Sequence, residues 1–320
     1  MRKSQRSSTR TVLAALVLSA ASTSAGRAAS QTPAQPPPAP AAAPDFSKVE
    51  IKTTKIGANF YVLEGQGGAI GVLAGPDGVL MVDSQFAPLT EKIVAAITQI
   101  SDRPIKFLIN THVHGDHTGG NENLAKKGVT IVARDELRNR LASPPTGPKP
   151  AAAALPMVTY HGGVTFHMNG ADVQLIPVPV AHTDGDTMVA IGVPGWTSSP
   201  DVIMTGDFFR SVGYPNIDRA NGGTLKGLLD GFTAVIDLAG PATKIVPGHG
   251  AIVDEAGVAA HRDMAVALRD KVAALVRQGK TQEEVLAAKP TSEYDARVPQ
   301  AAQTADRFIG QLYAEIKGAR

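Results

Sequence analysis

The chain has 320 residues, of which 43% are hydrophobic, and it contains no cysteine. This length corresponds to one large domain or two small ones, with enough apolar side chains for a core. The absence of cysteine excludes disulfide bonds and thiolate metal ligands. The 31 basic side chains nearly balance the 29 acidic ones, for a formal net charge of +2.

The first 28 residues have the pattern of a signal peptide. Four basic residues, the last of them Arg10, precede an apolar run over residues 11–21, and residues 26–28 suit a cleavage site. The alternative, a retained membrane helix, conflicts with the short apolar run. We therefore expect a periplasmic or secreted protein without stable membrane anchoring after cleavage. Cleavage would remove five basic and no acidic residues, leaving 26 against 29 and a net charge of −3. We accordingly expect no nucleic-acid partner.

Residues 29–47 are rich in proline and alanine and lack apolar periodicity, which predicts a disordered spacer. Residues 48–256 contain the predicted strands and the motifs described below, and they form the predicted main domain. Residues 257–320 are predicted to form a helical extension that packs on this domain.

Residues 49–83 alternate and turn like a β-meander. We expect residues 60–63 to pair with residues 69–73, and a Pro-Asp-Gly turn to precede a strand at 79–83. A helix over residues 90–100 follows, and then strands over residues 105–109 and 129–133. This succession of strands and helices is typical of layered α/β proteins.

A cluster of histidines follows the strand at 105–109. It places His112, His114 and His117 within six positions, beside Asp116. An extended six-residue segment spans at most about 20 Å, so a turn would bring the four side chains together. Imidazole and carboxylate groups are preferred ligands of zinc and similar divalent metals. A purely structural explanation would require a separate partner for each buried imidazole. We therefore predict a metal site.

Asp83 ends the strand at 79–83, close to where the histidine cluster should lie. We interpret it as a strand-end cap or turn residue. The alternative is that its carboxylate orients a metal ligand or the loop that carries it.

Residues 143–156 are rich in proline, glycine and alanine, which predicts an exposed loop. The loop is either a lid over the substrate or a passive surface insertion. Strands at 164–167 and 173–177 follow, and we interpret His161 and His167 in this region as structural.

Three further polar residues follow predicted strands. His182 lies in a Gly/Asp-rich loop, Asp207 ends an apolar strand that starts at residue 202, and His249 follows a strand that starts at residue 244. Layered α/β proteins assemble their sites at strand ends.

The order His-x-His-x-Asp-His, then His, Asp and Pro-Gly-His-Gly resembles the metallo-β-lactamase superfamily over residues 50–255. The resemblance implies an α/β fold, a four-layer αββα sandwich, with two metals along one edge of the sheets. It also implies seven ligands: His112, His114 and His182 for the first metal, Asp116, His117 and His249 for the second, and Asp207 as a bridge between them. This set is more similar to glyoxalase II-type hydrolases than to lactamases with cysteine or serine at the position of Asp207.

Two residues after Asp207 are similar to the substrate-binding residues of several lactamases in the superfamily. The resemblance implies that Arg210 binds a substrate carboxylate and that Asn216 stabilises an oxyanion. The alternative is that Arg210 is a surface ion-pair residue and Asn216 a turn residue. We expect Asp116 to position the second metal.

Helices are predicted over residues 224–238, 255–278 and 299–317. Thr281 and Glu284 have the spacing of a capping box at the start of another helix. We interpret Leu312, Tyr313 and Ile316 as core or dimer contacts.

We therefore predict a hydrolase with two Zn²⁺ ions, in which a metal-bound hydroxide attacks a carbonyl group. Iron or manganese are alternative metals. A β-lactam is the first candidate substrate, supported by the predicted export and by Arg210 and Asn216. A thioester, lactone or ester is the alternative, supported by the seven-ligand set, and a third hypothesis is a diiron redox protein on the same scaffold. The expected partner is a small-molecule substrate, and the oligomeric state stays open.

Overall fold

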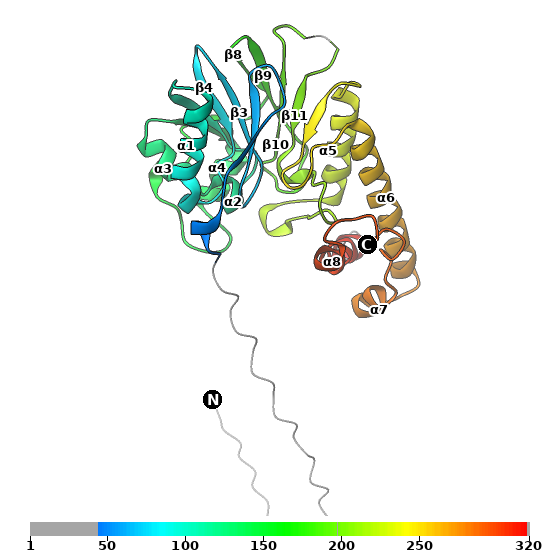
Figure 1. Ribbon diagram of the computed structural model, residues 1–320. Helices are drawn as coiled ribbons and strands as arrows, with labels where there is room; N and C mark the ends of the chain where they lie inside the picture. The colour runs from blue at the N-terminus through cyan, green and yellow to red at the C-terminus, as the bar shows by residue number, and fades with distance from the viewer. Residues whose placement is uncertain (1–43, 197, 319–320) are drawn as a thin grey trace, which may run out of the picture. The chain divides into compact units, whose positions relative to one another are not determined.

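The computed structural model describes residues 44–196 and 198–318, and from Asp45 the chain folds as one compact unit (Figure 1). The predicted signal peptide and the spacer up to residue 43 lie outside the described residues. Residues 45–47, which we assigned to the spacer, belong instead to the folded unit. Asp45 caps a 3₁₀ turn, Phe46–Lys48, and the ring of Phe46 lies 5.3 Å from that of Phe86. Aromatic packing therefore orders a segment that its proline-rich context predicted to be disordered.

The first sheet has seven strands in chain order. They are β1 (Lys52–Lys55), β2 (Phe60–Glu64), β3 (Ile70–Gly75), β4 (Gly78–Val82), β5 (Ile105–Ile109), β6 (Thr130–Arg134) and β7 (Val158–Tyr160). Strands β1 to β4 are antiparallel, and Phe60 opposite Leu73 confirms the predicted pairing. Strands β4 to β7 run parallel. We did not predict β7, because three residues are too few to show alternation.

The second sheet has five strands in the order β12-β11-β10-β9-β8. They are β8 (Val164–Met168), β9 (Ala171–Pro177), β10 (Thr187–Gly192), β11 (Val202–Met204) and β12 (Lys244–Val246). One buried cluster joins the two sheets and includes Leu73 and Ile109 of the first with Val173 and Met204 of the second. Burial of this shared apolar face holds the two sheets together.

Helices cover the outer face of each sheet (Figure 1). Helices α1 (Thr90–Ile100) and α3 (Asn121–Lys126) bury apolar side chains against the first sheet, and α4 (Asp135–Ala142) follows β6. Helices α5 (Leu225–Leu238) and α6 (Glu255–Arg277) pack against the second sheet. The four layers confirm the predicted αββα sandwich.

The C-terminal part continues from α6 into α7 (Gln282–Ala287) and α8 (Ala301–Gly318). The predicted domain boundary after residue 256 falls in the first turn of α6. The capping box of Thr281 and Glu284 is present at the start of α7. Leu312 and Tyr313 of α8 are buried in the same core cluster as α5 and α6, and they are therefore core contacts.

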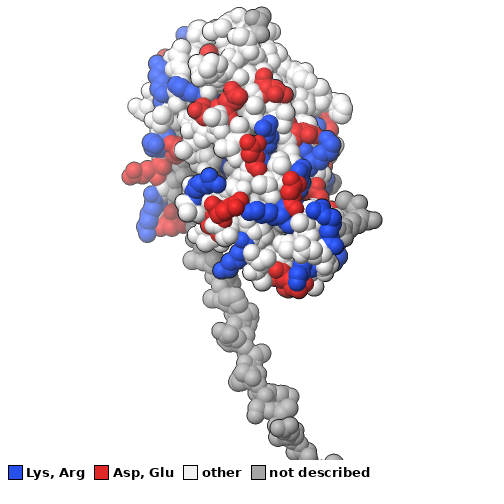
Figure 2. Space-filling model, turned by 90° about the vertical axis from the view of Figure 1, so that its right-hand side faces the viewer, with Lys and Arg blue, Asp and Glu red and all other residues white. Residues whose placement is uncertain are grey.

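Acidic and basic side chains are interspersed on the face that carries the C-terminal helices (Figure 2). Ion pairs of the helical layer include Lys226 with Asp230 at 2.6 Å and Lys271 with Glu293 at 2.8 Å. Exposed pairs of this kind each contribute little to stability. None of the described helices has an apolar stretch long enough to cross a membrane.

His261 on α6 is a titratable group inside the helical layer. Its ring lies 5.3 Å from the ring of Phe209 and 5.5 Å from that of Phe232. Its Nε2 atom is buried and has no hydrogen-bond partner among the described residues. Burial lowers the pKa of His261 to about 4. Between about pH 4 and 6.5, the imidazole is therefore neutral in the folded protein, whereas in the unfolded chain, with an ordinary pKa near 6.5, it binds a proton.

We expect His261→Leu to reduce the acid sensitivity of the fold. As the pH falls from about 6.5 to 4, proton uptake by the unfolded chain at His261 lowers the free energy of unfolding, by at most about 3 kcal/mol. Above that range the neutral imidazole has no such effect. Denaturant titrations of the variant and the wild type at several pH values should diverge in the variant's favour on acidification. His161→Leu, at a side chain that is 85% exposed, is the control, and a constant difference between the His261 variant and wild type would contradict the prediction.

Candidate metal centre

The structure brings together all seven residues that we predicted as metal ligands. Each follows or flanks a strand: His112 and His114 after β5, Asp116 and His117 in the short helix α2 (Gly115–Thr118), His182 between β9 and β10, Asp207 after β11, and His249 after β12. They form three groups whose donor atoms lie within 4.8 Å of one another: His112, His114 and His182; His112, His117 and Asp207; and Asp116, His117 and His249.

In the first group, outer hydrogen bonds fix which nitrogen of each ring faces the centre. His182 Nδ1 donates to the carbonyl oxygen of Asn216 at 2.8 Å, and His114 Nε2 donates to the carboxylate of Asp218 at 2.7 Å. In neutral rings the remaining nitrogens, His182 Nε2 and His114 Nδ1, then face each other with their lone pairs at 2.9 Å. Two such lone pairs repel unless a cation lies beside both of them.

The second and third groups meet around Asp207. Its Oδ1 atom lies 3.3 Å from His117 Nε2 and 3.3 Å from His249 Nε2. Asp116 Oδ2 lies 3.1 Å from His249 Nε2. Because Asp207 also groups with His112, its carboxylate links the two halves of the centre.

The charges of the centre favour a bound cation. Burial lowers the pKa of His112 well below its ordinary value and that of His182 to about 4, so both rings offer neutral lone pairs. Burial by itself would also lower the pKa of His117, but the carboxylates of Asp83 and Asp207 raise it well above its ordinary value. The carboxylates therefore require a positive charge at this place, which either a proton or a metal cation can supply.

Three donor atoms of the centre are buried and lack a hydrogen-bond partner within the described residues: His112 Nε2, His117 Nε2 and Asp207 Oδ1. Buried polar atoms without partners are costly. Nitrogen and carboxylate donors are the set that zinc, iron and manganese bind. The residues therefore fit two divalent cations.

Asp83 orients a metal ligand, which is the alternative to the strand-end or turn role that its position in the sequence predicts. Its Oδ2 atom accepts hydrogen bonds from His117 Nδ1 and from Thr111 Oγ1, both at 2.7 Å, and its Oδ1 atom accepts from the Thr111 backbone N–H at 2.8 Å. Thr111 Oγ1 in turn lies 3.1 Å from His112 Nδ1. One buried carboxylate therefore orients two imidazoles, as outer partners of metal ligands commonly do.

Sequence reasoning missed the role of Asp218, the carboxylate that holds His114. Asp218 lies two residues after Asn216, in a segment that we considered for substrate binding alone. The sequence signal available was an acidic residue in a loop that follows a predicted ligand, and this signal is weak because such residues are common in loops.

Arg210 and Asn216 both lie beside the centre. Arg210 Nη1 is 3.8 Å from Asp207 Oδ2, and its side chain is 17% exposed, which is inconsistent with a surface ion-pair residue. Asn216 Oδ1 accepts a hydrogen bond from Gln311 Nε2 at 2.9 Å. No residue in the described part of the chain accepts a hydrogen bond from Nδ2 of Asn216. His161 and His167 lie outside the centre and are largely exposed.

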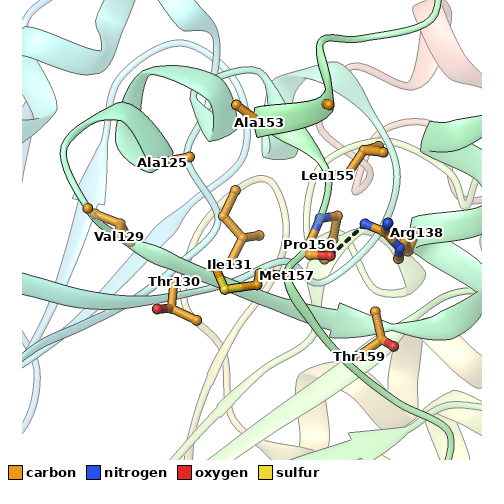
Figure 3. A pocket seen from close by; sticks show the side chains of 12 residues that line it. Ala125, Val129, Thr130, Ile131, Arg138, Ala153, Leu155, Pro156, Met157 and Thr159 are labelled. Carbon is orange, nitrogen blue, oxygen red and sulfur yellow. Dashed lines mark hydrogen bonds between the residues drawn. The ribbon is translucent and has the colours of Figure 1, made fainter.

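The second half of the 143–156 insertion is bonded to helices α3 and α4. Arg138 Nη1 donates to the carbonyl oxygen of Pro156 at 2.7 Å (Figure 3), and Asn121 Nδ2 donates to that of Ala154 at 3.1 Å. Residues 152–153 and 155–157 line a cavity of about 560 Å³ together with residues of α3 and β6, and none of the seven metal-site residues lines it. These contacts favour the surface-insertion interpretation for this half of the loop.

A four-layer αββα sandwich with two linked His/Asp groups at its strand ends defines a class of metal-binding protein. The family model of the metallo-beta-lactamase superfamily matches residues 63–249. The chain belongs to this superfamily.

The chain is 29% identical over 179 residues to the hydroxyacylglutathione hydrolase of Nitrosococcus oceani, a match that covers 55% of this chain and 60% of that protein. A solved metallo-beta-lactamase from Pontibacter korlensis is 19% identical, with a TM-score of 0.53 over 68% of this chain and 99% of the other. A sec-alkylsulfatase from Pseudomonas sp. is 15% identical, with a TM-score of 0.61 over 82% of this chain and 50% of the other. The chain spans less than two thirds of the length of the curated relatives it matches, and likeness to structures at these identities shows the fold alone.

Proposed function

We propose that the protein is a hydrolase with two zinc ions that cleaves an acyl bond in a small-molecule substrate. The observation that carries the proposal is that seven donor side chains converge while outer partners turn the imidazoles of His112, His114, His117 and His182 toward the centre. This is the preorganisation that metal-assisted hydrolysis needs.

Bound divalent cations would supply Lewis-acid polarisation of the substrate carbonyl group and would lower the pKa of a water molecule. The protein's own residues bind, orient and exchange protons around that chemistry. Burial by itself would raise the pKa of Asp116, but the hydrogen bond with His249 and the nearby His117 lower it, so this carboxylate is ionised at neutral pH and can accept a proton at Oδ2. The Nδ2 atom of Asn216 can donate to a carbonyl oxygen that gains negative charge.

β-Lactam amides are the first candidate substrate. Arg210 is a half-buried cation within 3.8 Å of Asp207, and its guanidinium can bind a substrate carboxylate through two parallel hydrogen bonds. Such a contact would place the bond to be cleaved beside the metal centre.

Thioesters are the second candidate. The specific observation in their favour is Asp207, which supplies a carboxylate that links both halves of the centre where lactamases of the superfamily have cysteine or serine. The match to a hydroxyacylglutathione hydrolase also favours a thioester substrate.

The test is a comparison of kcat/KM for a chromogenic cephalosporin, a glutathione thioester and an aliphatic lactone, with metal content measured on the same preparation. We expect about two metal ions per chain, with zinc giving the highest activity, and turnover of the cephalosporin above that of the other two. A preference for the thioester would replace the first candidate by the second. Two tightly bound irons without hydrolysis of any of the three would instead favour the diiron hypothesis and overturn the proposal.

A further inference from the structure

Two ligands of the first metal group are oriented by one loop. The backbone carbonyl oxygen of Asn216 accepts from His182, and the carboxylate of Asp218 accepts from His114. These two acceptors lie two residues apart, between the end of the 3₁₀ turn that holds Asp207 and the start of α5. The position of this short loop therefore decides where two of the three imidazoles point.

The loop is held from the C-terminal helix α8. Gln311 Oε1 accepts from the Ile217 backbone N–H at 3.0 Å, and Gln311 Nε2 donates to Asn216 Oδ1 at 2.9 Å. A second contact with α8 lies nearer the start of the helix, where Thr304 Oγ1 accepts from the Tyr214 backbone N–H at 3.0 Å. Gln311 is thus bonded to Asn216, which carries the first acceptor, and to Ile217, which lies between Asn216 and Asp218.

We propose that Gln311 is a positioning residue for the first metal group, through which the C-terminal helical extension controls metal binding at His114 and His182. Loss of its two hydrogen bonds frees Asn216 and Ile217 to shift, and the carbonyl oxygen of Asn216 then no longer fixes the ring of His182. Outer partners of metal ligands typically change metal affinity about 10- to 100-fold when removed. The inference rests on the proposed metal centre, and it concerns the first group alone.

The test is a titration of the metal-free protein with Co²⁺, followed by visible absorption and by the shifted, exchangeable N–H signals of the cobalt-bound imidazoles. Gln311→Leu keeps a similar volume but removes both hydrogen bonds. We expect it to weaken Co²⁺ binding at the three-histidine group about 10-fold and to speed exchange of the His182 N–H proton. The His117 N–H signal, held by Asp83, should be unchanged.

Gln303→Leu is the matched control, because Gln303 is an exposed residue of the same helix whose side chain has no hydrogen bond to the described residues. Gln311→Glu should largely restore binding, since a carboxylate accepts from Ile217 and, after rotation of the amide, from Asn216 Nδ2. Wild-type affinity in Gln311→Leu, or an equal loss at both metal groups in both Gln311 variants, would overturn the inference. A wild-type protein that binds no Co²⁺ would instead overturn the proposed function itself.

Discussion

We expect the His114→Ala variant to lose the first metal. Its activity should fall by more than the roughly 100-fold that removal of an outer partner of a metal ligand can cost. The substitution deletes one of three imidazoles that face a common point, and it leaves His182 Nε2 without the nitrogen that lies 2.9 Å away. It also leaves the carboxylate of Asp218 without the partner that lowers its pKa. Metal content and kcat/KM should therefore fall together.

His167→Ala is the control for this experiment. His167 is also bonded to a carboxylate, Asp172 at 2.6 Å, but its side chain is 76% exposed and lies outside the centre. The control should keep wild-type metal content and activity. Hydrolysis by a metal-free His114→Ala protein at the wild-type rate would contradict the assignment of a metal-dependent hydrolase.

Gly248→Ala should reduce activity nearly as much as His114→Ala does, although it removes no metal ligand. A Cβ atom at this position would lie 2.0 Å from Asp207 Oδ1 and 2.6 and 2.7 Å from the backbone carbon and oxygen of Gly206. Because the two latter contacts are with backbone, the clash can be relieved only if the loop that carries Asp207 or His249 shifts by about 1 Å. A displacement of that size at a catalytic centre can reduce the rate about 100-fold.

Gly115→Ala provides the comparison, since a Cβ atom there meets nothing within 4 Å although Gly115 is adjacent to Asp116. Both variants should be assayed for kcat/KM, metal content and thermal unfolding. We expect Gly115→Ala to resemble the wild type, and Gly248→Ala to lose activity by a factor larger than any loss of stability explains. Equal activity of the two alanine variants would show that the loop yields without moving Asp207.

The sequence predicted the layers of the fold because apolar periodicity is a local property. The α1 helix and the pairing of β2 with β3 follow from side chains that alternate or repeat within a few residues. The boundary of the spacer was wrong by three residues, since Phe46 is ordered by Phe86, which is 40 residues away in the sequence. Strand β7 was missed because three residues carry too little pattern.

The candidate ligands were visible in the sequence because imidazole and carboxylate side chains are few, and those of this centre follow strands. The residues that orient them were not visible in the same way. Asp83 is 34 positions from His117, Asp218 is 104 positions from His114, and Gln311 is 95 positions from Asn216. Each could serve many local roles, so its type and position predicted none of these contacts.

The sequence by itself determined the chemistry available to this protein, namely five imidazoles and two carboxylates at strand ends in a chain without cysteine. The tertiary structure alone decided which nitrogen of each ring faces the centre and how closely the backbone approaches it. The physical reason is that a hydrogen bond between residues far apart in the chain depends on the packing of whole sheets and helices, and no local pattern of side chains encodes it.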